Sequence, residues 1–209
     1  SSAAELARPN LLLGHWPLAG RGSADRYLVY GNLFLDNPSE ALLQAEGNVV
    51  LYNNVFVNRH GDGVMLREHN DVPRAIDVFG NTVLARGTGV LLRNADSTAA
   101  QEIDGNAIFA GFVEPLALSE ANFFRPYEGA SAVLRMPFAG NRALDLAPSG
   151  RGFGAGSTRS SRRALLPDVG LDFDRKPRGA TVIGAYASGA PADRRRFGIL
   201  DAKPTPVRA

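Results

Sequence analysis

Arginine recurs at the same position in two similar segments, GVMLRE (Gly63–Glu68) and GVLLRN (Gly89–Asn94). If these segments are neighbouring parallel strands, the guanidinium groups of Arg67 and Arg93 lie roughly 5 Å apart and repel each other unless an anion bridges them. Guanidinium groups bind carboxylates through paired hydrogen bonds. The pair therefore predicts a site for an acidic ligand such as a uronic acid. The alternative is that Glu68 and nearby aspartates neutralise the two arginines.

Polar side chains flank the first of these segments on both sides, and two of them are histidines, His60 and His69. Histidine and carboxylate side chains act as general bases or bind Ca²⁺ and Zn²⁺. The spacing here matches no metal-binding motif, so we predict no metal ligand and no cofactor, with Ca²⁺ kept as an alternative. The predicted catalytic residues are Arg67, Arg93, His60 and His69; the predicted ligand-binding residues are Gln44, Glu68, Asn94 and Ser119.

These side chains must be positioned by a repeated unit that occurs four times. The copies are YLVYGNLFLDN (Tyr27–Asn37), VVLYNNVFVNR (Val49–Arg59), AIDVFGNTVLAR (Ala75–Arg86) and QEIDGNAIFAG (Gln101–Gly111). The shared asparagine is Asn32, Asn54, Asn81 and Asn106, at spacings of 22, 27 and 25 residues. Self-similarity at such a period is typical of stacked repeat proteins.

The residue types around the shared asparagine predict a strand, a sharp bend and a second strand in each copy. Aliphatic residues stand three positions before it and apolar residues two positions after it, which is the alternation of a half-buried strand. The preceding residue is Gly31, Asn53, Gly80 or Gly105, types that tolerate left-handed backbone angles. We predict that the asparagines form a ladder of side-chain amides from coil to coil. The alternative is that each simply forms a turn.

A third strand per copy lies between these units. Its copies are ALLQ (Ala41–Gln44), Gly63–Glu68, Gly89–Asn94 and PLALSE (Pro115–Glu120), and Leu11–Leu13 is an earlier one. Alternation places Gln44, Arg67, Arg93 and Ser119 in one outward row. Tyr30, Tyr52 and Phe79 form a second outward row that either receives sugar rings or packs against loop residues. Three short strands per coil predict an all-β, right-handed parallel β-helix.

These repeats resemble those of the pectin-lyase-like superfamily of parallel β-helix proteins. Leu144–Gly156 (LDLAPSGRGFGAG) and Asp172–Tyr186 (DFDRKPRGATVIGAY) resemble the C-terminal segments of many bacterial secreted β-helix proteins, except for Arg175 in place of a glycine and the basic insert Ser157–Asp168. The resemblance implies that ligands bind on the outside of the third strand. Many lyases of this fold use a Lys or Arg base, and pectin hydrolases carry aspartates there. The only lysines are Lys176 and Lys203, beyond the repeats, so a lyase would depend on Arg67, Arg93 or a histidine.

Composition fits one folded domain and excludes several other classes. The chain has 209 residues, of which 44% are hydrophobic and 21% charged, and it contains no cysteine, which excludes disulfides and thiolate metal sites. A net charge of +2 gives little reason to expect a nucleic-acid partner. There is no apolar run long enough to span a membrane and no signal peptide at SSAAELARPN. Only Ala3–Ala7 could cap the first coil, so we expect additional N-terminal coils or a protein partner there.

We divide the chain into an N-terminal segment with a partial first coil (1–26), regular coils (27–120), degenerate coils with an irregular C-terminal cap (121–186) and a basic Pro/Arg tail (187–209). The first functional hypothesis is a secreted, periplasmic or cell-surface β-helix protein that binds, and cleaves in a lyase-like reaction, an acidic polysaccharide. The alternative is a non-catalytic scaffold or interaction domain, a C-terminal fragment of a longer protein.

Overall fold

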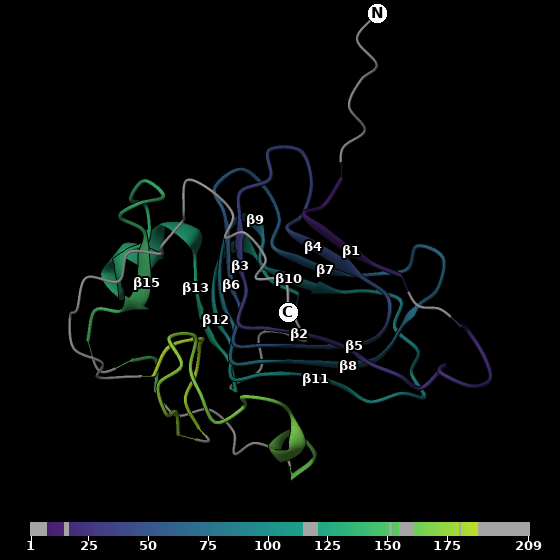
Figure 1. The fold of residues 1–209 in the computed structure, drawn as a ribbon. Coiled ribbons are helices and arrows are strands. Elements are labelled where there is room, and N and C mark those ends of the chain that lie inside the picture. Colours follow the sequence, from purple (N-terminus) through teal and green to yellow (C-terminus); the bar gives the residue numbers. More distant parts are fainter. Residues whose placement is uncertain are drawn as a thin grey trace, which may run out of the picture.

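The computed structural model describes residues 8–14, 17–114, 121–150, 152–154, 161–179 and 181–187. They form a parallel β-solenoid in which the chain winds repeatedly through three sheets (Figure 1). The predicted third-strand copy Pro115–Glu120, with Ser119, lies outside the described residues, as do the proposed cap Ala3–Ala7 and all of the predicted tail except Ala187. No helix in the described part of the chain is long and apolar enough to cross a membrane.

Each sheet takes one strand from each successive coil, and every neighbouring pair within the three sheets is parallel. Sheet A consists of β1 (Leu11–Leu13), β4 (Leu43–Ala45), β7 (Val64–Leu66) and β10 (Val90–Leu92). Sheet B consists of β2 (Tyr27–Tyr30), β5 (Gly47–Tyr52), β8 (Pro73–Phe79) and β11 (Gln101–Asp104). Sheet C consists of β3 (Leu33–Leu35), β6 (Val55–Asn58), β9 (Thr82–Thr88), β12 (Ala107–Phe112) and β13 (Phe123–Arg125).

The bend between sheets B and C uses the left-handed backbone that the residue types predict. Gly31, Asn53, Gly80 and Gly105 have φ angles of 66°, 53°, 63° and 63°. This conformation turns the chain within one residue and is accessible to glycine and asparagine at low steric cost. The shared asparagine follows this bend in every coil, so the asparagines of successive coils stack on one another along the solenoid.

The predicted asparagine ladder is confirmed, and it contains a fifth member. Asn32, Asn54 and Asn81 each donate a side-chain hydrogen bond to Oδ1 of the next asparagine, over 3.2, 3.0 and 2.9 Å. Asn106 donates in the same way to Asn122, over 3.0 Å. The backbone N–H of each donor also binds the same oxygen. Because Asn54, Asn81 and Asn106 are almost fully buried, these bonds satisfy amides that have no access to water.

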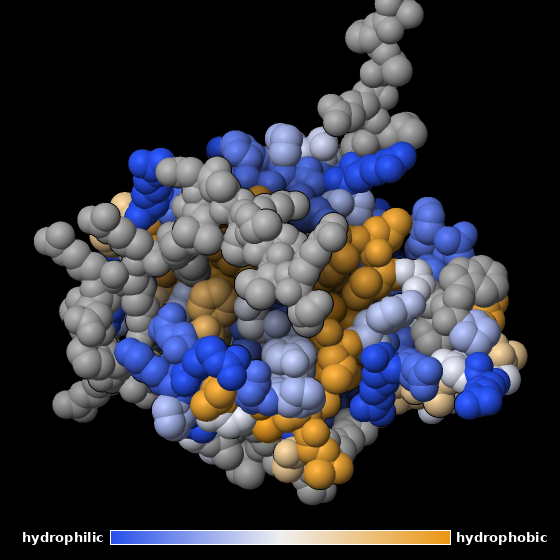
Figure 2. Space-filling view, in the orientation of Figure 1, coloured by the Kyte–Doolittle hydropathy of each residue, from blue (hydrophilic) through white to orange (hydrophobic). Residues whose placement is uncertain are grey.

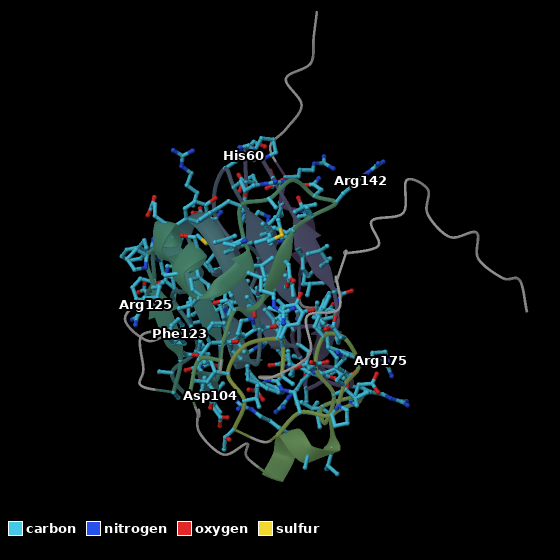
Figure 3. The ribbon with its side chains drawn as sticks, turned by 90° about the vertical axis from the view of Figure 1, so that its left-hand side faces the viewer. His60, Asp104, Phe123, Arg125, Arg142 and Arg175 are labelled. Atoms are coloured by element: carbon cyan, nitrogen blue, oxygen red, sulfur yellow. The ribbon has the colours of Figure 1, made fainter. Side chains whose placement is uncertain are left out.

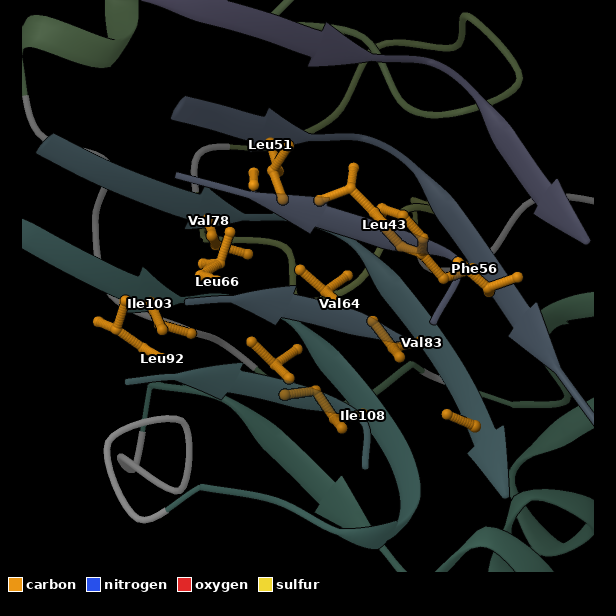
Figure 4. Close-up of a cluster of buried hydrophobic side chains, with 14 of the residues drawn as sticks. Leu43, Leu51, Phe56, Val64, Leu66, Val78, Val83, Leu92, Ile103 and Ile108 are labelled. Atoms are coloured by element: carbon orange, nitrogen blue, oxygen red, sulfur yellow. The ribbon is translucent and has the colours of Figure 1, made fainter. Parts of the chain in front are cut away.

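Inward side chains from all three sheets form one continuous core inside the coils. Figure 4 shows how residues such as Leu43, Leu51 and Phe56 in one coil lie next to Val64, Val78 and Val83 in the following coil. Aromatic rings also stack along the axis, with the centroids of Phe34 and Phe56 4.7 Å apart. This spacing is that of neighbouring strands in a sheet, so each coil is held by the coil on either side.

The chain after the coils folds against the outside of sheet C. Its described residues include the 3₁₀ helices η2 (Tyr127–Ala132) and η3 (Ser161–Leu165) and the antiparallel strands β14 (Leu134–Met136) and β15 (Asp145–Pro148). Outward residues such as Leu84 and Phe109 pack there against Leu144, Phe153 and Tyr186. The segment that sequence resemblance identifies as typical of secreted β-helix proteins therefore covers one face of the solenoid.

The outside of sheet B is covered by the residues around η3. The outward row of Tyr30, Tyr52 and Phe79 is a stack with centroid spacings of 4.8 and 5.2 Å. Tyr52 and Phe79 are buried, and the Tyr52 hydroxyl donates a 2.7 Å hydrogen bond to the carbonyl oxygen of Pro167. Burial raises the pKa of Tyr52. Of the two alternatives for this row, packing against other parts of the chain is the correct one.

Candidate functional site

A polar pocket lies on the outer face of sheet A, where ligands were predicted to bind. Its volume is about 370 Å³. Three predicted site residues line it, Gln44, His60 and Arg67, together with Asp62 and Met65. The segment Pro38–Ala41 forms the rest of the wall with Gly61. The structure thus brings part of the predicted site together.

The floor of the pocket is set by the register of sheet A, which corrects one prediction. Gln44 is paired with Met65, and Met65 with Leu91, so these three side chains form the outward row. Gln44 was predicted to stand beside Arg67, but it lies two residues away from that position. Met65 and Leu91 are buried and pack with Ala41. The floor is consequently apolar, with one amide at Gln44.

Arg67 and Arg93 follow β7 and β10 at equivalent positions, as predicted. The Arg67 N–H donates to the carbonyl oxygen of Ala45 over 3.2 Å, and the Arg93 N–H donates to that of Leu66 over 2.9 Å. Both side chains are exposed, and neither forms a salt bridge with any other residue that the structure describes. Two adjacent positive charges therefore remain available to an anionic ligand.

Glu68 and Asn94 are also brought together, but they do not neutralise the arginines. The Asn94 side chain donates a 2.7 Å hydrogen bond to Glu68 Oε1. This bond joins the residues that follow Arg67 and Arg93 and ties the two neighbouring coils at the edge of the site. The alternative in which Glu68 pairs with the arginines is not what the described residues show.

The wall of the pocket is held by hydrogen bonds that fix its loops. Asp62 Oδ1 accepts the backbone N–H of Thr88 over 2.6 Å, which leaves the loop little freedom. Glu40 Oε2 accepts a 3.1 Å hydrogen bond from the Gln44 side chain. The His60 N–H donates to Asn58 Oδ1 over 3.1 Å, while its side chain is exposed. Of the two histidines that the structure describes, His60 and His69, His60 lines the pocket.

Glu40 was not predicted as a site residue, although a sequence signal was present. The segment Asn37-Pro-Ser-Glu40 has the composition of a turn. Asn37 Oδ1 accepts the backbone N–H groups of Ser39 and Glu40, at 3.1 and 2.9 Å. This turn brings Glu40 to the rim of the pocket, four residues before Gln44.

His69 follows β7, at the other end of the strand from His60, and belongs to a different loop. Its backbone N–H, with those of Asn70 and Asp71, donates to Glu46 Oε2 over 3.0, 2.8 and 3.0 Å. Glu46 is only 2% exposed, so its carboxylate holds this loop from inside the fold. His69 does not line the pocket. Sequence reasoning grouped the two histidines by their nearness in the chain, and the structure separates their roles.

A cluster of four charged side chains lies away from the pocket. Figure 3 shows His60 near the upper edge of the molecule and Asp104 near the lower edge. Asp104 belongs to an acidic cluster with Asp77 and Glu102 that surrounds Arg163. Among the described residues, no group of three or more His, Asp or Glu side chains is placed to hold a metal ion.

The fold and the pocket define a class: a parallel β-solenoid whose sheets B and C are covered by its own C-terminal segment, with a polar pocket and two exposed arginines at sheet A. Comparison of the chain with protein-family models, with curated proteins and with solved structures gives no match.

Proposed function

We propose that the protein binds an acidic polysaccharide along the outer face of sheet A, outside the cell or at its surface. The observation that carries this proposal is the pair Arg67 and Arg93, exposed on neighbouring coils without a salt bridge among the described residues. Guanidinium groups spaced by one strand suit successive carboxylates of an extended uronic-acid polymer. The polar wall of the adjacent pocket adds hydrogen-bond donors and acceptors for sugar hydroxyls.

The site also contains groups suited to cleavage by β-elimination, the lyase-like reaction implied by the resemblance to the pectin-lyase-like superfamily. Arg67 would bind the uronate carboxylate and stabilise the negative charge that develops on it. The His60 imidazole would remove the proton from C5, and that electron pair would form the C4–C5 double bond. The glycosidic oxygen on C4 would leave with the bonding electrons and take a proton from water. The elimination needs no oxidant.

Binding is tested by substituting the two arginines singly and together. We expect Arg67→Ala and Arg93→Ala each to weaken binding of polygalacturonate or alginate about tenfold, since each removes a charged hydrogen-bond pair worth about 1.5 kcal/mol or more. Arg26→Ala, at another exposed position, is the matched control and should leave the affinity unchanged. Equal affinities of all three variants and the wild type, measured by titration calorimetry, would contradict the proposal.

Elimination is tested separately by the ultraviolet absorbance of its unsaturated product. Growth of this absorbance on one uronan, its loss in His60→Ala and its persistence in His69→Ala would assign His60 as the base. Binding should survive in His60→Ala, because the charged contacts remain. If no uronan yields product while the arginine variants still lose affinity, the protein is a binding module without lyase activity.

A further inference from the structure

The charge along the outer face of sheet A changes sign between the two arginines and the coil that contains β4. Arg93 and Arg67 directly follow β10 and β7, and the residue that directly follows β4 is Glu46. The Glu46 side chain forms no salt bridge with another described residue, and its Oε1 accepts no hydrogen bond from any of them. A third uronate in line with those at Arg67 and Arg93 would therefore meet a negative charge.

Two more carboxylates line the pocket that begins beside Arg67. Glu40 and Asp62 are both half-buried there, and neither forms a salt bridge with any residue that the structure describes. Glu40 Oε2 accepts a hydrogen bond from the Gln44 side chain, and Asp62 Oδ1 accepts the Thr88 N–H. The second oxygen of each carboxylate accepts no hydrogen bond from the described residues. Each carboxylate thus has one oxygen fixed by the fold and one oxygen left for a ligand.

A buried asparagine holds the two acidic loops at fixed positions. Asn58 is 0% exposed, and its side-chain amide donates to the backbone carbonyl oxygens of Glu40 and Asp62 over 3.3 and 2.8 Å. Its Oδ1 accepts the backbone N–H groups of Asn37 and His60 over 3.3 and 3.1 Å. Figure 2 shows hydrophilic side chains gathered along the upper edge of the molecule, the edge at which Figure 3 shows His60. A ligand therefore meets carboxylates that are already in place and does not have to order the loops.

The lining of the pocket disfavours an anionic sugar and favours an ammonium group. Carboxylates without a cation in contact repel a uronate and attract a positive charge, and both effects are stronger in a half-buried pocket than in open water. A hexosamine with a free amino group carries such a charge. Its hydroxyl groups suit the Gln44 amide, and its ring suits the apolar floor formed by Ala41 and Met65.

We propose that the pocket binds an amino sugar whose ammonium group is held by Glu40 and Asp62, next to a uronate bound by Arg67. The ligand of sheet A is then an oligosaccharide with both charge signs, in which a uronic acid is linked to a hexosamine that is not acetylated. An acetylated hexosamine is uncharged and leaves both carboxylates without a counter-ion. The place of the uronate rests on the proposed function, whereas the place of the ammonium group rests on the two carboxylates alone.

The test compares oligosaccharides of equal length by titration calorimetry: hyaluronan fragments, in which glucuronate alternates with N-acetylglucosamine, and the same fragments after chemical deacetylation. We expect the deacetylated fragments to bind about tenfold more tightly, a difference of about 1.4 kcal/mol. The double variant Glu40→Gln/Asp62→Asn should bind both fragments equally. Both replacements keep an oxygen that accepts the hydrogen bond from Gln44 or Thr88. Glu128→Gln, at an exposed position in η2, is the matched control and should keep the preference.

The wild type alone already decides the main point. Equal affinity for the two kinds of fragment would overturn the inference, and so would a preference that survives in the double variant. Thermal melting shows whether the double variant is folded; if it is not, the single variants Glu40→Gln and Asp62→Asn should each reduce the preference.

Failure of this inference is distinguishable from failure of the proposed function. If Arg67→Ala/Arg93→Ala weakens binding of oligogalacturonate but the wild type does not prefer deacetylated fragments, only the amino-sugar inference fails. If the arginine variant binds oligogalacturonate as tightly as the wild type does, while the preference for deacetylated fragments depends on Glu40 and Asp62, the uronate site fails and the amino-sugar site stands.

Discussion

Arg163 is a deeply buried arginine whose guanidinium group contacts three carboxylates. It is 2% exposed. Its Nε lies 2.9 Å from Asp77 Oδ1, its Nη1 lies 2.6 Å from Asp104, and its Nη2 lies 3.1 Å from Glu102. Its guanidinium carbon lies 4.3 Å from the centre of the Phe79 ring. Burial raises the pKa of Asp77, and hydrogen bonds and charge from Arg163 oppose that rise. The positive charge of Arg163 thus offsets the repulsion among three carboxylates that the fold brings together.

We predict that Arg163→Met lowers the free energy of unfolding by about 3 kcal/mol or more, because it leaves Asp77 buried without its counter-charge. Arg175→Met is the matched control: Arg175 pairs with Asp168 over 3.0 Å, but its side chain is 69% exposed, and an exposed pair contributes little. Urea unfolding of both variants measures the difference. If Arg163→Met and Arg175→Met lose the same free energy of unfolding, Arg163 contributes no more than an exposed charge.

The Asp36–Arg59 pair predicts a dependence of stability on pH. Burial of the Asp36 carboxyl opposes its ionisation, but hydrogen bonds from the side chain and backbone of Arg59 outweigh this effect, and the pKa of Asp36 is lowered. A lowered folded-state pKa contributes stability above the unfolded value, near 3.8, and that contribution is lost as the pH falls through the folded-state pKa. Asp36 has a φ of 42°, a backbone that asparagine also tolerates.

Asp36→Asn is therefore expected to be less stable than the wild type at neutral pH and to approach it in stability under acid conditions. Denaturant unfolding at several values between about pH 6 and pH 2 measures the two curves. Curves that stay parallel over this range would show that ionisation of Asp36 does not contribute. The reverse crossing, with the wild type gaining stability in acid, would contradict the direction of the pKa shift.

At the scale of secondary-structure elements, the C-terminal segment is fastened to the coils at two neighbouring bends, the one between β5 and β6 and the one between β8 and β9. Arg178 is buried and donates to the Asn53 side chain and to the carbonyl oxygens of Val182 and Gly184, the last two at 2.8 and 2.7 Å. Its guanidinium lies directly over Gly80, where a Cβ atom would stand 2.6 Å from Nη1. Gly80 thus has two roles: it adopts the left-handed backbone of the bend, and its missing side chain leaves room for the Arg178 guanidinium.

Gly80→Ala should cost clearly more stability than Gly105→Ala. Both glycines have a φ of 63°, so both variants incur the left-handed strain of about 1–2 kcal/mol. At Gly105 the nearest atom to a new Cβ is 3.8 Å away, so nothing has to move, whereas at Gly80 the new methyl group displaces Arg178. Thermal unfolding of the two variants tests this. Similar melting temperatures would mean that the Arg178 contact contributes nothing to stability.

The strands and the ladder could be predicted because the chain repeats its local chemistry, whereas the exact neighbours could not. Alternation correctly assigned Gln44 to the outer face, but the structure pairs it with Met65 rather than placing it beside Arg67. The error is a shift of two residues, and such a shift leaves every side chain on the same face of a strand. The coils differ in length because their loops differ. The spacing of the repeats alone therefore does not fix which residues pair between neighbouring strands. Glu46, at the position aligned with Arg67 in the preceding coil, was overlooked for the same reason.

At the scale of the whole molecule, the position of the C-terminal segment could not be predicted. Arg163 belongs to the basic insert that departs from the resemblance, yet it is the buried anchor of that segment. Contacts such as Arg163 with Asp77 join residues 86 positions apart, and no repeat or local pattern connects them. Sequence resemblance singled out the segment Asp172–Tyr186, but only the structure shows how it is held. Asp172 accepts the backbone N–H groups of Lys176 and Ala187 within the segment. Arg178 and the backbone N–H of Ala185 connect the segment to the coils by donating to the side chains of Asn53 and Thr82.

The arrangement of coils and coverings predicts a gradient of local stability along the solenoid. Strands β5 and β8 lie between neighbours in sheet B, and β6 and β9 do so in sheet C, while β1, β2 and β3 have a neighbouring strand on one side only among the residues that the structure describes. In a solenoid each coil is stabilised mainly by the coils adjacent to it. Amide hydrogen exchange should therefore be at least about tenfold faster in β2 and β3 than in β5 and β6, with Asn32 the least protected member of the ladder.

The same measurement tests whether contact between neighbouring coils causes this gradient. If a peptide with the sequence of the second coil, Val49–Arg59, pairs with β2 and β3, the protection of these strands should rise towards that of β5 and β6, because each would then lie between two neighbours. The unrelated strand β10 is the internal control and should not change. Uniform protection in the free protein would contradict the gradient, since it would mean that the first coil is stable without a neighbour.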